Sequence, residues 1–247
     1  MKKSFSTFVR FKPFLRWLGL FTLAWFALQI YFLSHIALMR YVNPSSTTFQ
    51  RSQARQIFQI KKELSWRQDW VDSRDISSHL KRAVIASEDD IFATHDGVQW
   101  EAIERAWHSN IKSQQQTQTK NVKKVKIVGG STITQQLAKN LFLSGERTFF
   151  RKSQEFILTI GLEMFLSKQR ILEIYLNHVE WGQGVFGAQA AARHYFQKSA
   201  SQLTPWEAAR LAVILPRPKY FEKLPQSPYL SDRTEIILAR MNGAVLP

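Results

Sequence analysis

The hydrophobic positions of this chain follow two patterns. From Trp17 to Met39 the sequence contains no Asp, Glu, Lys or Arg and shows almost no polar face. As a helix this run would be about 34 Å long, enough to cross a bilayer core of about 30 Å. Beyond residue 75, apolar residues recur at helical spacing and period-two alternation is scarce. The pattern therefore predicts a mainly α protein preceded by one apolar helix.

The apolar run is predicted to be an uncleaved membrane anchor. A cleaved signal peptide would have a shorter apolar region and a small-residue cleavage site, and residues 35–40 form a poor site. A buried core helix would carry a polar face. Basic residues precede the run with no acid among them, so the positive-inside rule keeps the N-terminus in the cytoplasm. Basic residues also follow the run, which makes the charge contrast modest.

These signals divide the chain into four parts. Residues 1–16 form a basic cytoplasmic tail, 17–39 the transmembrane helix, 40–70 a juxtamembrane connector and 71–247 a domain outside the cytoplasm. The connector mixes polar, basic and aromatic residues, which is typical of a segment at lipid headgroups and equally of a solvated linker. Residues 108–128 carry lysines but no acid, which predicts a mobile basic loop or a surface loop without a role.

Composition narrows the function classes. The chain has 34 Lys+Arg against 19 Asp+Glu, a net charge of +15, which favours an anionic partner: phospholipid, nucleic acid or a phosphate-bearing substrate. The absence of cysteine excludes a disulfide scaffold, a thiolate zinc site and a cysteine nucleophile. Residues 182–187 have G-x-G-x-x-G spacing, but no strand precedes them, so dinucleotide binding is rejected. The H-E-x-x-H, Walker A and K-T-G motifs are absent.

Two segments carry residues suited to chemistry. Glu88 opens a run of three acids at the end of an apolar helix, and crowded carboxylates raise one another's pKa, as a general base or acid requires. The alternative is a solvated acidic cap. In residues 129–140, glycines and hydroxyls precede a helix that Thr132 and Gln135 would open as a capping box. Free N–H groups, the helix dipole and Lys139 would form an anion site there, unless the segment is an ordinary cap.

Two further segments are less specific alone. Arg147 and the stretch 151–155 combine basic residues with Glu155, which could equally be a helical ion pair. The spacing in residues 168–177 mostly indicates helix packing. Together, the four segments resemble glycosyltransferase family 51, the peptidoglycan polymerases. The matching motifs are E-D-x-x-F-x-x-H-x-G at 88–97, G-G-S-T-I-T-Q-Q at 129–136, R-K-x-x-E at 151–155 and I-L-E-x-Y-L-N at 171–177.

The resemblance covers about residues 65–240, and the segment 110–129 is longer than is usual in the family. It implies a mainly α, lysozyme-like head with a small membrane-proximal jaw lobe that includes part of 100–128. It also implies an activity: transfer of a growing lipid-linked glycan strand onto the GlcNAc 4-hydroxyl of lipid II. The new bond is β-1,4 with inversion, and undecaprenyl pyrophosphate leaves.

By the same resemblance, Glu88 is the catalytic base and Glu155 the second catalytic glutamate, while Asp89 and His95 hold the shape of their motif. The residues expected to bind substrate are Lys139, Arg147, Arg105, Ser131, Thr132 and Gln136. No cofactor is required and no residue is assigned as a metal ligand. A divalent cation, Mg²⁺ or Mn²⁺, near the pyrophosphate is the one candidate.

The resemblance places the protein in a bacterial inner membrane, with its catalytic domain in the periplasm. The expected partners are lipid II, the lipid-linked strand and inner-membrane lipids, with cell-division or wall-synthesis proteins as further candidates and no nucleic acid. Two alternatives stay open at this point. A lysozyme-like hydrolase would also use a glutamate in an α-rich fold, and a non-enzymatic protein could bind nucleic acid or a partner through its charge alone.

Overall fold

Hydroxyl side chains mark most helix starts in this protein. The computed structural model describes residues 6–63, 66–100, 104, 130–143, 145 and 148–247. Side-chain oxygens accept backbone N–H groups of the first helical turn at Thr47, Ser77, Thr132, Thr148, Ser167 and Thr204. The capping box predicted at Thr132 is present, and so is the one that the spacing of Thr204 and Glu207 predicts. Pro205 opens the second of these helices.

The elements are almost all helical. The helices are α1 (Ser6–Leu38), α2 (Thr48–Lys61), α3 (Ser78–Glu88), α5 (Ile133–Phe142), α6 (Phe149–Phe165), α7 (Lys168–His178), α8 (Ala188–Phe196), α9 (Pro205–Ile214), α10 (Pro218–Phe221) and α11 (Pro228–Arg240). The strands are β1 (Arg67–Gln68), β2 (Glu180–Gly182) and β3 (Val185–Phe186). The prediction of a mainly α protein is confirmed.

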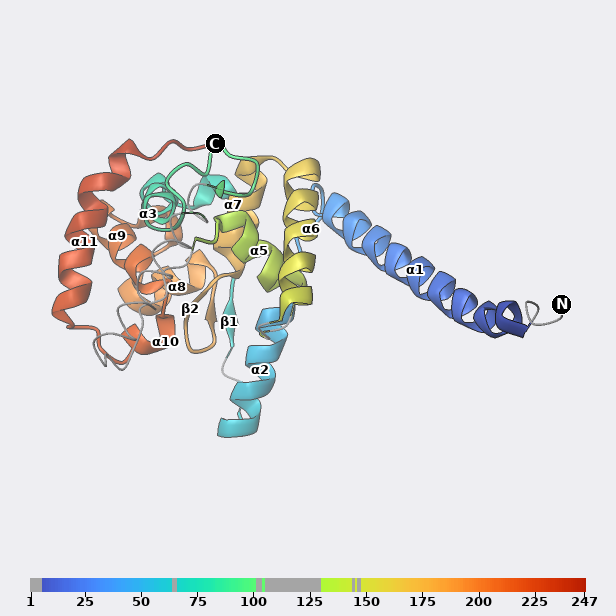
Figure 1. The fold of residues 1–247 in the computed structure, drawn as a ribbon. Coiled ribbons are helices and arrows are strands. Elements are labelled where there is room, and N and C mark those ends of the chain that lie inside the picture. Colours follow the sequence, from blue (N-terminus) through green and yellow to red (C-terminus); the bar gives the residue numbers. More distant parts are fainter. Residues whose placement is uncertain (1–5, 64–65, 101–103, 105–129, 144, 146–147) are drawn as a thin grey trace, which may run out of the picture.

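Two groups of helices form the globular part of the molecule, which we call the head (Figure 1). Helices α3, α9 and α11 pack on one another, and α5 packs against α6 and α7. One continuous core joins the groups, with Leu80 of α3, Leu137 of α5 and Leu158 of α6 almost completely buried. This packing brings the end of α3 close to α5, which matters for the site below.

The short strands form a small sheet in the order β1-β3-β2. Residues 182–187, which have dinucleotide-motif spacing, form the β2–β3 hairpin between α7 and α8. Gly187 has φ +82°, and a Cβ there would lie 2.7 Å from the backbone oxygen of Asn177. The glycine pattern therefore serves a tight turn and makes no phosphate loop. The expectation that no strand precedes these residues is wrong, because the short strand β2 leads into them.

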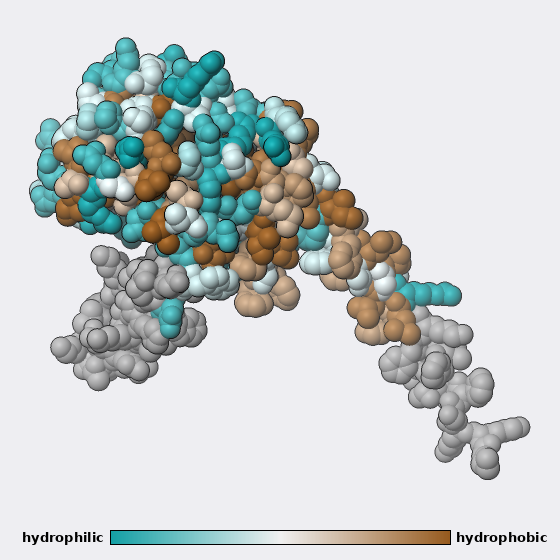
Figure 2. All heavy atoms as spheres, turned by 90° about the horizontal axis from the view of Figure 1, so that it is seen from above, coloured by the Kyte–Doolittle hydropathy of each residue, from teal (hydrophilic) through white to brown (hydrophobic). Residues whose placement is uncertain are grey.

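Helix α1 leaves the head as a long rod (Figure 1). Its segment Phe14–Leu38 is long and apolar enough to cross a membrane, and most of that segment's side chains are exposed. A core helix would be buried instead. Hydrophobic side chains line α1 and continue onto the adjoining edge of the head (Figure 2). The predicted apolar helix is thus present, with bounds close to those expected.

The segment 40–70, which the sequence assigns to a connector, contains two ordered elements. Helix α2 begins with a Thr47–Gln50 capping box, buries Gln50 and Ile57, and packs against α5. Strand β1 pairs in parallel with β3. This segment therefore contributes packing to the head. The predicted basic loop at 108–128, and with it most of the proposed jaw, lies outside the described residues.

Candidate active site

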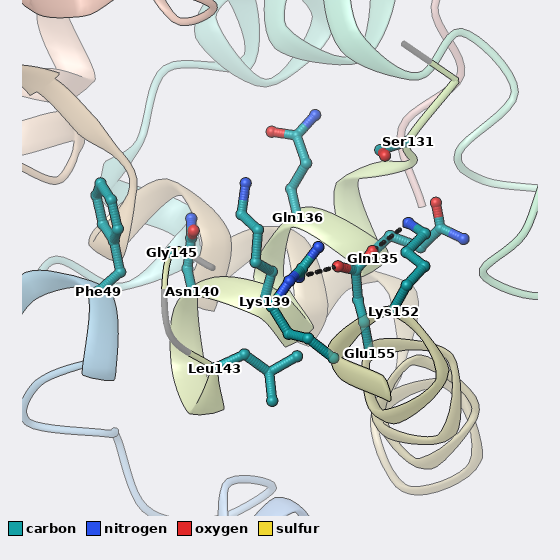
Figure 3. A pocket seen from close by; sticks show the side chains of 11 residues that line it. Phe49, Ser131, Gln135, Gln136, Lys139, Asn140, Leu143, Gly145, Lys152 and Glu155 are labelled. Carbon is teal, nitrogen blue, oxygen red and sulfur yellow. Dashed lines mark hydrogen bonds and ion pairs between the residues drawn. The ribbon is translucent and has the colours of Figure 1, made fainter. Parts of the chain in front are cut away.

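A cavity of about 360 Å³ lies where α2, α5 and α6 meet (Figure 3). Its lining combines polar and basic side chains, and both of the segments that the sequence marks as an anion site and a basic cluster contribute to it. The lining residues are Phe49, Ser131, Gln135, Gln136, Lys139, Asn140, Leu143, Gly145, Arg151, Lys152 and Glu155.

Glu88 lies beside this cavity at the C-terminus of α3 and contacts it through Gln136. The Gln136 Nε2 donates to Glu88 Oε2 at 2.8 Å, and the hydroxyl of Tyr175 donates to Gln136 Oε1 at 3.0 Å. Burial raises the pKa of Glu88, and the negative charge of Asp89 raises it further, while Gln136 and Lys139 act in the opposite direction. A carboxylate with a raised pKa is suited to accept a proton during a reaction.

Asp89 and His95 form a buried scaffold next to Glu88. The backbone N–H of Gly97 donates to His95 Nδ1 at 2.9 Å, so the proton of a neutral ring lies on Nε2. That nitrogen donates to Asp89 Oδ1 at 2.8 Å. Gly97 has φ +83°, and a Cβ there would lie 2.8 Å from atoms of Thr159 and Glu163. These contacts explain the His-x-Gly end of the motif through structure alone, without a chemical role.

The same aspartate joins the acidic motif to the start of α5. Asp89 Oδ2 accepts the backbone N–H of Ile133 at 2.9 Å, so a negative charge lies at the positive end of the helix dipole. Thr132 is buried; its hydroxyl donates to the carbonyl of Gly97 at 2.6 Å and accepts from Gln135 N. Ser131 lines the cavity, whereas Thr132 lies behind it and fastens two motifs together.

The negative charges of Glu155 and Glu88 both act on Lys139. Burial lowers the pKa of Lys139, and the cations of Arg151 and Lys152 lower it further; Glu155 and Glu88 oppose this shift. Glu155 is almost fully buried on α6 and accepts from Arg151 Nη1 at 2.7 Å and from Lys152. Figure 3 shows Lys139 and Gln136 projecting from α5 to the same side, with Glu155 held against the basic side chains.

The cavity therefore carries three cationic side chains around one buried carboxylate. Such a site is suited to an anion with several negative oxygens, because ammonium and guanidinium groups form charge-assisted hydrogen bonds to them. The cavity does not fit a metal ion that is coordinated by protein side chains alone. Within the described residues no three His, Asp or Glu side chains are grouped for a metal, and both Glu155 oxygens already accept from basic groups.

The structure brings most of the predicted site residues together. Gln136 donates to Glu88, and the charges of Glu88 and Lys139 act on each other. Ser131, Gln136, Lys139 and Glu155 line the same cavity. The predicted substrate-binding Arg105 and Arg147 lie outside the described residues.

Three contributions were missed at the sequence level. Tyr175 belongs to the motif at 171–177, whose spacing indicated only packing, yet its hydroxyl orients Gln136. Phe49 comes from α2, where no motif points to the site. Arg151 is recognisable as the ion-pair partner of Glu155, but its place in the cavity lining is visible only once α5 and α6 are packed together.

Comparison with known proteins agrees with this geometry. The transglycosylase family model matches residues 53–242. The chain is 50% identical over 226 residues to the biosynthetic peptidoglycan transglycosylase of Paraburkholderia xenovorans (strain LB400), covering 91% of this chain and 90% of that protein. It is 49% identical over 221 residues to the protein of the same name from Janthinobacterium sp. (strain Marseille), covering 89% and 91%. This chain belongs to the transglycosylase family.

Proposed function

We propose that this protein polymerises the glycan strands of peptidoglycan from lipid II. The observation that carries the proposal is a glutamate of raised pKa, Glu88, linked through Gln136 to a cavity with three cationic side chains. Glycosyl transfer from a diphosphate-linked donor needs both parts, a base for the acceptor hydroxyl and cations for the leaving group. The names of the two related transglycosylases support the same activity.

In this proposal Glu88 accepts the proton of the acceptor GlcNAc 4-hydroxyl. The oxygen forms a bond to the anomeric carbon of the donor strand as the bond from that carbon to the pyrophosphate breaks. The electron pair of the broken bond leaves with undecaprenyl pyrophosphate, whose charge Lys139, Arg151 and Lys152 neutralise. Attack opposite the leaving group inverts the donor α linkage to β-1,4.

Glu155 has a supporting role in this scheme. It is buried between Arg151 and Lys152 and accepts from both, so it holds them at the cavity instead of taking the acceptor proton. We assign Ser131 and Gln136 to substrate binding at the cavity wall. Arg105 and Arg147 are proposed as further pyrophosphate contacts on the resemblance alone. Thr132 was also expected from the resemblance to bind substrate. Because it lies behind the cavity, we propose that it acts by holding the N-terminus of α5 in place.

Action at a bilayer follows from the long lipid of such a substrate. We propose a single-pass topology in which α1 spans the inner membrane, the N-terminus stays in the cytoplasm and the head works in the periplasm. The exposed apolar side chains on α6 support it, because α6 packs against α1 and adds apolar surface beside that helix. They are Phe149, Phe150, Phe156, Ile160 and Met164.

A lysozyme-like hydrolase is not favoured. It would need one glutamate and a water molecule, and it gives no reason for the cations around Glu155 or for an apolar helix beside the site. Nucleic-acid binding through charge alone gives no reason for Glu88. Partner proteins in division or wall synthesis stay predictions.

The test is to incubate the purified full-length chain in detergent micelles with lipid II and separate the products. The proposal expects long lipid-linked glycan that a β-1,4-muramidase degrades, together with released undecaprenyl pyrophosphate. Matched incubations with preformed cell walls should release no fragments. Degradation of the walls without polymer from lipid II would favour the hydrolase instead.

A further inference from the structure

Gln29 is the one side chain between Phe14 and His35 that is buried, although it lies inside the apolar span of α1. Its amide is paired twice with the amide of Gln154 on α6. Gln29 Nε2 donates to Gln154 Oε1 at 3.0 Å, and Gln154 Nε2 donates to Gln29 Oε1 at 2.9 Å. An amide facing hydrocarbon without a partner is costly, so this pair selects one arrangement of the two helices.

The same two helices touch again two turns further on. A Cβ at Gly161 would lie 2.7 Å from Leu33 Cδ2 and 3.3 Å from Ile36 Cδ1, so this glycine permits close approach of α1 to α6. Ile36 is fully buried there. The steps from Gln29 to Ile36 and from Gln154 to Gly161 are equal, so the two helices run in the same direction along this contact, which we call the seam.

A third contact fixes the end of α1 on α7. The guanidinium of Arg170 donates from Nε to the carbonyl of Met39 at 2.9 Å and from Nη2 to Asn43 Oδ1 at 2.6 Å. Glu173 on the same helix accepts from Arg170 Nη1 at 2.7 Å and so holds the guanidinium in place. The membrane helix is therefore docked on the head at three points along its last turns.

We propose that Gln29 is a positioning residue for the transfer reaction, and this inference rests on the proposed function. Gln154 precedes Glu155 on α6, and successive residues of a helix point about 100° apart. The amide pair therefore sets the rotation of α6 about its axis. That rotation aims Glu155, Arg151 and Lys152 at the cavity. The anchor thus helps to hold the pyrophosphate-binding cations in place, in addition to tethering the enzyme.

The test compares the full-length variants Gln29→Leu, Gln154→Leu and the double variant in lipid nanodiscs with lipid II. Each single variant leaves one amide without its partner, whereas the double variant replaces both by apolar groups, which can be nearly neutral. We expect each single variant to lower kcat by about 3- to 30-fold, the fold-change that corresponds to the free energy of an interhelical hydrogen bond in a membrane, and to raise KM, because the same cations bind lipid II. The double variant should return to within about 2-fold of wild type.

Thr22→Val is the matched control on the same helix, because Thr22 is exposed and its hydroxyl bonds only the Leu18 carbonyl within the part of the chain described. Its kcat should be unchanged. A normal kcat for a folded Gln29→Leu protein overturns the inference. A double variant whose kcat is no higher than that of the less active single variant also overturns it.

If the Gln29 variants fail to fold, Gly161→Ala and its double variant with Leu33→Ala replace them. Gly161→Ala should lower kcat, and removing the Leu33 branch should restore part of it. No loss, or no recovery, again contradicts the inference.

A distance measurement separates this inference from the proposed function. The chain has no cysteine, so spin labels can be attached at cysteines replacing the exposed Ile30 and Ser153. We expect a narrow distance distribution in the otherwise unaltered chain, broadening in Gln29→Leu and narrowing again in the double variant. Unchanged distances overturn the positioning role. Changing distances in a protein that makes no polymer would overturn the proposed function and leave the seam standing.

Discussion

At the scale of single residues, the site depends on one carboxylate kept apart from neighbours that would neutralise it. The carboxylate of Asp89 accepts hydrogen bonds from His95 and from the backbone N–H of Ile133 at the start of α5. The carboxylate of Glu155 forms ion pairs with Arg151 and Lys152. Glu88 accepts a hydrogen bond from an uncharged amide instead. Burial raises the pKa of Glu88 and the charge of Asp89 adds to the shift, although Gln136 and Lys139 oppose it.

The pH profile should report this environment. Below its pKa Glu88 is protonated and cannot accept a proton, so kcat/KM should fall as pH falls, with an apparent pKa above the usual value of about 4.3. Gln136→Leu removes a hydrogen bond that favours the carboxylate and should move this acidic limb to higher pH. Tyr175→Phe, which only frees Gln136 from its donor, should shift it less. The measurement is kcat/KM from about pH 4 to pH 8. An acidic limb that moves to lower pH in Gln136→Leu would contradict the assignment of Glu88 as the base.

Substitutions of Lys139 and of Glu155 should affect lipid II binding and turnover differently. Lys139→Ala removes a charge that faces the leaving pyrophosphate, so affinity for lipid II and turnover should both fall. Lys81→Ala is the control, because Lys81 is also partly buried but lies outside this cavity. Glu155→Gln should lose less turnover than loss of the base, since it only loosens Arg151 and Lys152. Wild-type lipid II binding by a folded Lys139→Ala protein would argue against this site for the pyrophosphate.

At the scale of elements, local sequence signals predicted helices well where a cap and an apolar period coincide. Thr132 and Thr204 are examples. Helix α2 has an equally clear capping box at Thr47, but few of its residues are buried, so its apolar period is weak and the segment resembles a linker. Tyr175 was missed for another reason: it contacts Gln136 across 39 positions of the chain, and only packing of α7 on α5 reveals that contact.

The start of α5 offers a test at this scale. Thr132→Ala should destabilise the protein by about 1 to 2 kcal/mol through loss of the cap, and should also lower turnover because the Gly97 carbonyl loses its partner beside Asp89. Thr204→Ala removes the same kind of cap on α9 and should destabilise by about 1 kcal/mol without changing turnover. Thermal melting and initial rates check both. Equal effects of the two substitutions on turnover would show that the link between the motifs has no catalytic consequence.

At the scale of the whole molecule, the apolar helix α1 packs against α6 of the head. The sequence predicts the anchor and four family motifs, but not that α1 docks along α6 or that α2 supplies Phe49 to the cavity. Those features depend on contacts between residues far apart in the chain, such as Gln29 with Gln154. The basic tail and the bulk of the head should lie on opposite sides of the membrane.

Reporter fusions test that topology. Alkaline phosphatase joined after about residue 60 should be active, because the enzyme folds only outside the cytoplasm and the positive-inside rule directs this segment there. A fusion before Trp17 should be inactive. Activity measured in whole cells distinguishes the two, and the reverse pattern would place the head in the cytoplasm and rule out a site facing lipid II in the periplasm.

The central claim is that Glu88 is the base of a glycan-forming reaction, and one substitution tests it most directly. Glu88→Gln keeps the size of the side chain and removes the basic carboxylate, so the initial rate of lipid II polymerisation should drop by about 10²-fold or more. Binding of lipid II should persist, because the cations around Glu155 are untouched. The measurement is rate and affinity for the same preparation, with folding checked by thermal melting. Near-normal polymerisation by a folded Glu88→Gln protein would contradict the account.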